Sequence, residues 1–285
     1  MADDSTEPVL QELRWAGALA DELLGRLERG VGAVVTWYNH ASLSRSMAAG
    51  VRVERFTHVG IDGLLLRTLA VPDAPRTSAD LLLPILFAHA PRGSRVALIG
   101  STPANVRSAA VEISDMPSRP RVVLVQDGYE GLPEPRDMAA RLHEERVDIV
   151  VVGLGAPLQD TYVLGLREFG PRSALMLTCG GWIDQVSHPS YYPDFAYRLR
   201  INWLIRVMRE PRRLWRRYTH EALDALRQRS SLRGFLCGPG RVPVDTMNAA
   251  CGVTSDGSCA SVPSEADAIS PPGGEARVDD GAARR

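Results

Sequence analysis

The sequence predicts an α/β fold built on a mostly parallel, doubly wound, Rossmann-like sheet. Short apolar runs rich in β-branched residues alternate with stretches that carry apolar residues at helical spacing, and this alternation is typical of strands joined by crossover helices. We count about six such strands and expect right-handed crossovers between them. Glycine-containing turns follow several strands. Because sheets of this kind bind ligands at the carboxyl ends of their strands, we expect site residues there.

The chain begins with one predicted helix and then enters the sheet. Residues Leu10–Arg29 place Leu, Trp and Ala at helical spacing, and Gly30 ends the pattern. The strand GAVVT follows and ends at Thr36, and a helical stretch, ASLSRSMAAG, comes next. The apolar run VRVERFTHVGIDGLLLRTLA then carries Asp62 directly before a glycine. An Asp-Gly pair is most often a turn, so the residues alone favour a turn former over a functional carboxylate.

The middle of the chain repeats the strand and helix alternation. RTSADLLLPILFAHA predicts a helix, and SRVALIG predicts a strand that ends at Gly100. The helical stretch ANVRSAAVEI follows this glycine, and RVVLVQDGYEG and EPRDMAARLHEERV predict another strand and another helix. Gly100 therefore lies in a turn that leads from a strand into a helix.

A glycine-rich turn follows the buried strand predicted over 148–152. Gly153 and Gly155 let the backbone bend tightly and approach a ligand, and Pro157 suits the first position of a helix, where no amide donor is missed. The start of such a helix presents free N–H groups and a positive dipole end to an anion. A phosphate site and a plain tight turn are equally good interpretations of this pattern.

Side chains near these turns have two interpretations as well. Gln159 and Asp160 fall in the first helical turn, where they cap the helix or contact a nucleotide. The strand ALMLT leads in the same way into Gly180 and Gly181, and Asp184 follows as a helix cap or a site residue.

Several of these residues come from strands that are distant in sequence. Thr36, Asp62, Gly100, Gly153 and Gly180 all fall at or just past the carboxyl ends of predicted strands. The carboxyl ends of parallel strands meet at one edge of the sheet, so these residues are expected to share one site.

An arginine-rich stretch lies between Arg198 and Arg217. It holds eight Arg and one acid, Glu210, among Trp, Leu, Ile, Val and Met, with Pro211 interrupting it. Three interpretations stay open: a solvated charged face, a nucleic-acid patch, and an amphipathic helix on an anionic membrane surface. The nucleic-acid interpretation is the weakest because the net charge of the chain is only −1. All 33 basic residues are Arg, so part of this content reflects coding bias.

Composition and termini exclude several classes of protein. The first ten residues are acidic and polar, which argues against a signal peptide, and no run of apolar residues is long enough to span a membrane. We therefore expect a cytoplasmic protein. The four cysteines form no CxxC pair, and Cys179, after an apolar strand, is expected to be buried.

Two kinds of cofactor chemistry are disfavoured. The six histidines are scattered, and no HxH, HxxxH or DxD spacing occurs, so we expect no metal site. GLGAPL lacks the third glycine of the GxGxxG dinucleotide fingerprint, which argues against a Rossmann-type oxidoreductase.

Three motifs in order, GLGAPLQD, CGGWID and NWLIRVMREPRRLWRRY, resemble those of the WecG/TagA/CpsF glycosyltransferase family. The resemblance covers roughly 31–218 and implies a catalytic base at Asp62, with Thr36 and Asn39 orienting a sugar. It also implies a UDP-sugar site at the residues that follow the glycine turns and in the arginine-rich stretch: Gly100, Gly153, Gly155, Pro157, Gln159, Asp160, Gly180, Gly181, Asp184, Arg206, Arg209 and Arg212. The chain departs from the family pattern at three places: Asp160 and Asn202 stand where the family has Glu, and Thr36 and Asn39 are one residue further apart.

The resemblance implies an inverting glycosyltransferase. It would move a hexose or N-acetylhexosamine from a UDP-sugar, without a cofactor, to a lipid-pyrophosphate-linked sugar in exopolysaccharide or other cell-surface polysaccharide synthesis. The enzyme would dock peripherally on the inner face of the cytoplasmic membrane through 198–217. The main alternative is a catalytically silent nucleotide-sugar or lipid-binding component of a polysaccharide assembly machine. A homo-oligomer is left open.

Four segments follow from these interpretations. We expect an N-terminal helix over 1–30, an α/β glycosyltransferase core over 31–197, an Arg-rich amphipathic helical appendage over 198–233 and a tail over 234–285. The tail is rich in Gly, Ala, Ser, Pro and Asp and poor in large apolar residues, so we expect it to be disordered.

Overall fold

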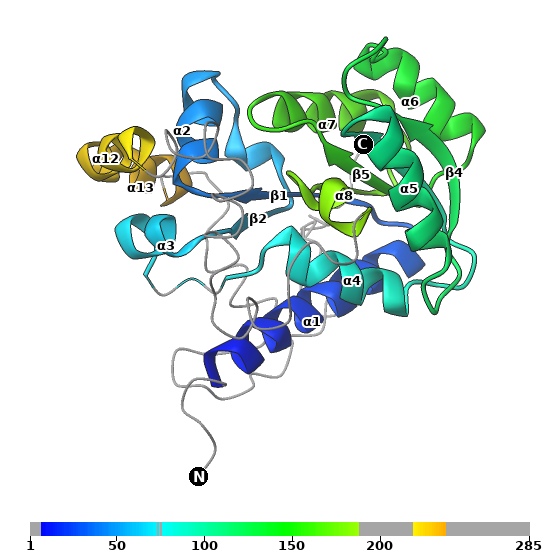
Figure 1. The fold of residues 1–285 in the computed structure, drawn as a ribbon, viewed down its shortest axis with the longest axis horizontal. Coiled ribbons are helices and arrows are strands. Elements are labelled where there is room, and N and C mark those ends of the chain that lie inside the picture. Colours follow the sequence, from blue (N-terminus) through cyan, green and yellow to red (C-terminus); the bar gives the residue numbers. More distant parts are fainter. Residues whose placement is uncertain (1–6, 73, 75, 188–218, 238–285) are drawn as a thin grey trace, which may run out of the picture. The chain divides into compact units, whose positions relative to one another are not determined.

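The computed structural model describes residues 7–72, 74, 76–187 and 219–237, all of which lie in the compact unit Met1–Cys251. Figure 1 shows a sheet with helices on both faces. The strands are β1 (Ala33–Tyr38), β2 (His58–Ile61), β3 (Arg95–Gly100), β4 (Arg121–Gln126), β5 (Ile149–Gly153) and β6 (Leu175–Thr178). The helices are α1 (Glu7–Glu28), α2 (His40–Ala48), the 3-10 turn η1 (Val53–Arg55), α3 (Leu64–Ala70), α4 (Ala79–His89), α5 (Pro103–Ser114), α6 (Pro135–Glu144), α7 (Leu158–Phe169), α8 (Trp182–Val186), α12 (His220–Arg227) and α13 (Arg229–Cys237).

The described strands form one six-stranded sheet in the order β2-β1-β6-β5-β3-β4. Every neighbouring pair is parallel. The predicted α/β class and parallel sheet are therefore confirmed. Registers such as Tyr38 opposite Ile61 and Gly100 opposite Gly153 align the carboxyl ends of the strands at one edge.

The β-branched runs form strands here because both faces of the sheet are covered. Successive side chains of a strand point to opposite faces. Val150 and Val152 of β5 accordingly pack in one hydrophobic cluster, whereas Ile149 and Val151 pack in the other. All four side chains are buried.

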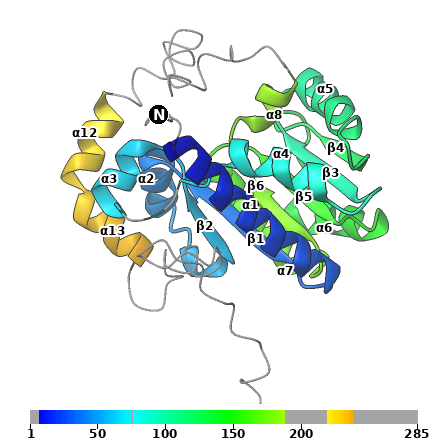
Figure 2. The ribbon, with the colours of Figure 1, turned by 90° about the horizontal axis from the view of Figure 1, so that it is seen from below.

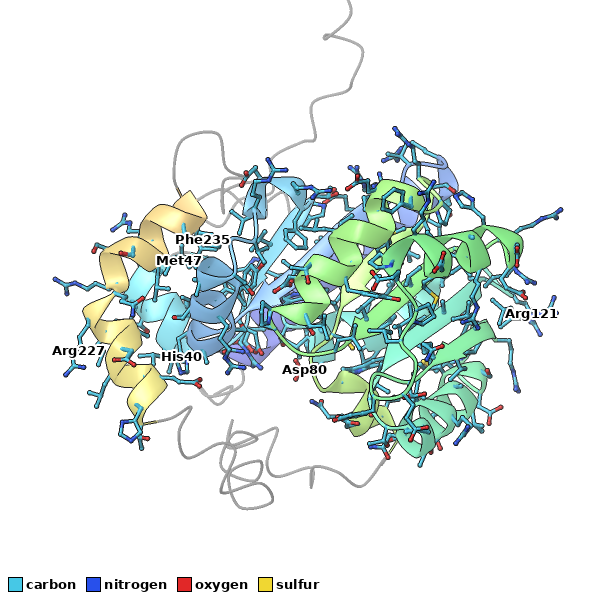
Figure 3. All side chains as sticks on the ribbon, turned by 90° about the horizontal axis from the view of Figure 1, so that it is seen from above. His40, Met47, Asp80, Arg121, Arg227 and Phe235 are labelled. Carbon is cyan, nitrogen blue, oxygen red and sulfur yellow. The ribbon has the colours of Figure 1, made fainter. Side chains whose placement is uncertain are left out.

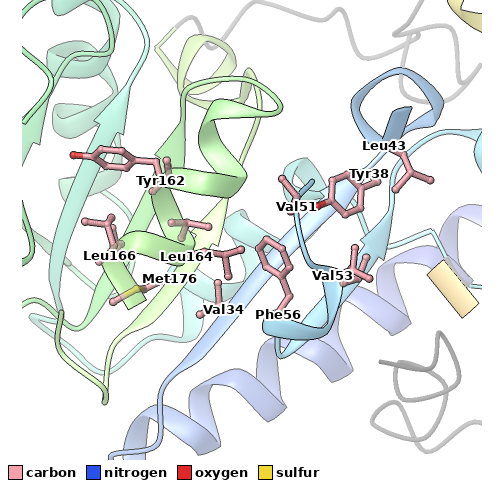
Figure 4. Packing of buried hydrophobic residues seen from close by; sticks show 14 of the residues in the cluster. Val34, Tyr38, Leu43, Val51, Val53, Phe56, Tyr162, Leu164, Leu166 and Met176 are labelled. Atoms are coloured by element: carbon pink, nitrogen blue, oxygen red, sulfur yellow. The ribbon is translucent and has the colours of Figure 1, made fainter. Parts of the chain in front are cut away.

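One layer of helices contains α2, α6 and α7. Their apolar side chains, among them Leu43 and Leu166, pack with Val34, Tyr38 and Met176 of the strands (Figure 4). Helices α12 and α13 join this side, because α12 contacts α2 and α13 contacts α3. Met47 of α2 and Phe235 of α13, labelled in Figure 3, both pack against the same cluster.

The opposite layer contains α1, α4, α5 and α8 (Figure 2). Helix α4 lies along α1, and its apolar residues on several sides are buried, including Leu82, Leu83 and Phe87. The Phe87 ring stacks on Trp182 of α8 with centroids 5.9 Å apart. Cys179 is buried next to this contact, as predicted, and burial raises the pKa of its thiol to about 12.

The element boundaries differ from the sequence prediction by small shifts. The first helix is present as α1, although it begins before Leu10. The strand expected over 148–152 runs from Ile149 to Gly153, and Pro157 precedes the first residue of α7 instead of occupying it. The arginine-rich stretch 198–217 lies outside the described residues. Of the tail expected over 234–285, residues 234–237 instead form the end of α13, and residues 238–285 lie outside the described residues.

Candidate active site

The carboxyl ends of the strands bring several predicted residues to one edge of the sheet. Gly100 and Gly153 are the last residues of β3 and β5, and Asp62 directly follows β2. Gly180 follows β6 closely, whereas Thr36 lies inside β1. Helices α5 and α7, which follow the neighbouring strands β3 and β5, lie on opposite faces of the sheet. This arrangement is a topological switch point, where open α/β sheets bind ligands.

Three glycines leave bare backbone at this switch point, and we call Gly100, Gly153 and Gly180 the glycine strip. A Cβ atom on Gly100 would lie 2.3 Å from the Gly153 carbonyl oxygen, and φ at Gly100 is +127°. A Cβ atom on Gly153 would lie 2.9 Å from the Gly180 carbonyl oxygen. No other residue type fits at Gly100 or Gly153, because neighbouring atoms of the protein already occupy the place of a side chain there. A Cβ atom on Gly180 would meet nothing within 4 Å, so a ligand can approach the backbone at this glycine.

Asp184 lies beside the glycine strip and is held by two side chains. The Ser101 hydroxyl and the Asn105 amide both donate to its Oδ1, the latter at 2.9 Å. Ser101 has φ of +60°, an unusual conformation for a residue with a side chain. Both partners come from the segment after β3, so Asp184 is tied to the switch point and its orientation is fixed.

The start of α7 carries a buried amide. Gln159 is 4% exposed, and its Oε1 has no hydrogen-bond partner among the residues that the structure describes. Buried polar atoms are normally paired. Gln159 therefore retains an acceptor at the helix start where the sequence predicted a nucleotide contact. Gly155, two residues after β5, has φ of +75° and makes the turn.

Asp160 lies in a buried hydroxyl network. Thr36 Oγ1 donates to its Oδ1 at 2.8 Å, and Ser46 Oγ donates to its Oδ2 at 2.6 Å. The Thr36 and Thr178 hydroxyls are 2.9 Å apart, and Thr178 acts as donor because Thr36 gives its proton to Asp160. All four side chains are at most 1% exposed, and we call them the Asp160 network.

Burial dominates the electrostatics of the Asp160 network. It raises the pKa of the Asp160 carboxyl, although the hydrogen bonds from Ser46 and Thr36 act in the opposite direction. Burial also raises the pKa of Tyr38, and the nearby Asp160 charge adds to this effect. The structure thus brings Thr36 and Asp160 together inside the protein, where both side chains are buried.

Asp62 and Asn39 lie on adjacent strand ends. The Asp62 amide donates to the Tyr38 carbonyl at 2.7 Å, which fixes the turn after β2 next to the end of β1. Asn39 caps α2: its Oδ1 accepts from the amides of Ala41 and Ser42 at 3.1 and 3.0 Å. The side chain of Asp62 is 34% exposed. Asp62 is therefore both a turn residue and an accessible carboxylate.

A guanidinium that the sequence interpretation missed faces Asp62. Arg76 Nη2 lies 3.7 Å from Asp62 Oδ1, and the Arg76 backbone forms a parallel bridge with Ile61. Ser101 and Asn105 at Asp184, and Ser46 and Thr178 at Asp160, were missed in the same way. Their partners are distant in the chain, so no local motif reveals them.

Some predicted features fall outside the described residues. Gly181 precedes α8, but Arg206, Arg209 and Arg212 are not described. In the part of the chain that is described, no group of three or more His, Cys, Asp or Glu could hold a metal ion, and no helix is long and apolar enough to cross a membrane.

Fold and site together define a class of protein: a doubly wound α/β protein with a glycine-lined switch point and an accessible carboxylate at the same sheet edge. Residues 11–233 match the model of the glycosyl transferase WecG/TagA/CpsF family, and the chain belongs to this family. The protein is therefore a glycosyltransferase.

Proposed function

We propose that the protein is an inverting glycosyltransferase that uses a UDP-sugar. It transfers a hexose or N-acetylhexosamine to a lipid-pyrophosphate-linked sugar in the synthesis of an exopolysaccharide or another cell-surface polysaccharide. Family membership supports glycosyl transfer itself. The geometry at the carboxyl edge of the sheet supports the assignment of roles to individual residues.

The observation that carries the proposal is the position of Asp62. It is a partly exposed carboxylate at the end of β2, beside the Asn39 cap and within 3.7 Å of Arg76. A general base must be within reach of the hydroxyl whose proton it takes. Asp62 is partly exposed and meets this requirement, whereas Asp160 is buried within its hydroxyl network.

The proposed reaction is a single displacement. Asp62 takes the proton from the acceptor hydroxyl while that oxygen forms a bond to the anomeric carbon of the donor. The bond between the anomeric carbon and the β-phosphate oxygen breaks, and UDP leaves with the electron pair. Attack opposite the leaving group inverts the anomeric centre. Asn39 orients a sugar hydroxyl through its amide, and Thr36 acts indirectly, by holding Asp160 at the start of α7.

The donor nucleotide would lie along the glycine strip. The open space over Gly180 allows a pyrophosphate to approach the backbone, and the start of α7 adds a positive dipole end. Asp184 and Gln159 supply side-chain contacts to the nucleoside. Arg206, Arg209 and Arg212 would neutralise the departing UDP, with no metal ion needed in this mechanism.

The acceptor lipid implies a membrane location. We propose that the enzyme docks peripherally on the inner face of the cytoplasmic membrane through 198–217, which carries eight Arg. Each basic residue near an anionic surface contributes about 1 kcal/mol, so a cluster of this size is sufficient for docking.

The test is UDP release from a panel of UDP-sugars, with and without a sugar-pyrophosphoryl-lipid acceptor, in the presence of EDTA. Wild type should release UDP only with both substrates, and Asp62→Asn should lose about 10²–10⁴-fold in rate. Asp21→Asn is a matched control, because Asp21 is exposed on α1. It should keep full activity.

Two results would overturn the proposal. Near-normal turnover by folded Asp62→Asn would remove Asp62 as the base. UDP binding without release across the whole panel would favour a nucleotide-sugar-binding component in place of this transferase.

A further inference from the structure

Arg76 is surrounded by carboxylates from three different parts of the fold. Its Nη1 donates to Glu12 Oε2 of α1 at 3.3 Å, and its Nη2 lies 3.7 Å from Asp62 and 4.0 Å from Asp80 of α4. Asp80 is labelled in Figure 3. We call these four residues the Asp62 cluster. One guanidinium charge is thus shared among three acids.

The contact with Glu12 differs from the other two. It is the shortest of the three, and it has hydrogen-bond geometry. The Glu12 side chain is only 8% exposed, whereas those of Asp62 and Asp80 are 34% and 25% exposed. A nearly buried carboxylate interacts with a guanidinium more strongly than an exposed one, because water screens it less. Glu12 is therefore the main anchor of the Arg76 side chain, while the bridge to Ile61 holds its backbone.

The three acids raise the pKa of Arg76. Burial alone would lower the pKa of the guanidinium, but Asp62, Asp80 and Glu12 outweigh burial and raise it. The described groups near Asp62 include no second cation at ion-pair distance. On α3, the Arg67 guanidinium donates to the Pro72 carbonyl, and Asn39 at the start of α2 is neutral.

We propose that Glu12 is a positioning residue for glycosyl transfer, acting on Asp62 through Arg76. Glu12 holds the guanidinium where it faces Asp62 without forming a close hydrogen-bonded pair with it. A close pair would occupy the Asp62 oxygen that must accept the acceptor proton, and it would make Asp62 a weaker base. This inference rests on the proposed role of Asp62 as the base.

The test compares Glu12→Gln with Glu28→Gln, a matched change at an exposed position of the same helix. In Glu12→Gln, Arg76 is released toward Asp62 and one negative charge is lost. Both effects strengthen the attraction between the guanidinium and the Asp62 carboxylate. In a plot of kcat against pH, the rise on the acidic side should therefore move to lower pH by about 0.5–1 unit. We call this rise the acidic limb. The plateau should fall about two- to threefold because the base is weaker.

Other measurements separate positioning from stability. The KM for the donor should stay unchanged, Asp80→Asn should shift the acidic limb in the same direction by less, and Glu28→Gln should match wild type. If kcat of Glu12→Gln falls without a shift of the limb, Glu12 only supports the fold and the inference is wrong. An unshifted limb with normal kcat overturns it too. Normal turnover by Asp62→Asn would instead overturn the proposed function itself.

Discussion

The Asp62 cluster and the Asp160 network hold two aspartates at the same edge of the sheet in opposite environments. Asp62 is partly exposed and faces a guanidinium that two other acids share. Asp160 is fully buried, and its two oxygens accept from the Thr36 and Ser46 hydroxyls. These two hydroxyls occupy both oxygens of the Asp160 carboxylate, so neither oxygen is left to accept a proton from a substrate. The comparison indicates that the partners of an acid decide whether it serves chemistry or the fold.

The largest effect is expected at Asp62. The substitution Asp62→Asn exchanges the acid for an amide, and its rate and its stability are measured together. Asp62→Asn should lose about 10²–10⁴-fold in kcat if it is the base. Its free energy of unfolding should change by less than about 1 kcal/mol, because a half-exposed ion pair contributes little. Urea unfolding and UDP release on the same preparation measure both. A large loss of stability would show that Asp62 is a structural residue.

Asp160→Ala should show the opposite pattern. Two buried hydroxyls lose a charged acceptor, and each such hydrogen bond contributes about 1.5–3 kcal/mol, so we expect a loss of about 3–5 kcal/mol in the free energy of unfolding. Asp160→Asn keeps one acceptor oxygen and should cost less than half as much. Chemical denaturation of both variants checks this order. Equal stabilities of wild type and Asp160→Ala would contradict the structural role.

A smaller effect is expected from Thr36→Val, which keeps the shape of the side chain and removes its hydroxyl. Asp160 loses one donor and Thr178 loses its acceptor, so the free energy of unfolding should fall by about 1–2 kcal/mol. If Thr36 acts only through Asp160, the KM values for both substrates should stay within about twofold of wild type. A loss in kcat with unchanged stability would instead mean that Thr36 contacts substrate directly.

The sequence predicted the fold well because its signals are local. Runs such as VALIG and IVVV are buried on both faces and need no knowledge of their partners to be identified as strands. The glycines at strand ends were predicted for the same reason. The residues alone could not show that Asp62 is accessible and Asp160 buried, because the difference lies in Arg76, Ser46 and Thr36, which reach each acid only through the fold. Asp160 follows a glycine turn in a family motif, and its pattern gives no sign that its side chain points inward.

The pH dependence of stability provides the finest test of the comparison. Burial raises the pKa of Asp160 above its ordinary value of 3.8, so the folded protein holds this proton more tightly than the unfolded chain does. The resulting stabilisation is fully present below 3.8 and is lost as the pH rises through the raised value. Asp160→Asn cannot titrate at this position. The free energy of unfolding of wild type, relative to that of Asp160→Asn, should therefore decrease as the pH rises above 3.8 and then level off.

Urea unfolding of the two proteins between about pH 4 and about pH 7 measures this difference, since other titrating groups largely cancel. A difference that instead grows with pH would mean that the folded protein favours the ionised carboxylate. The hydroxyls of Thr36 and Ser46 would then outweigh burial. In that case burial would not set the charge of Asp160, and accessibility alone would separate the catalytic acid from the structural one.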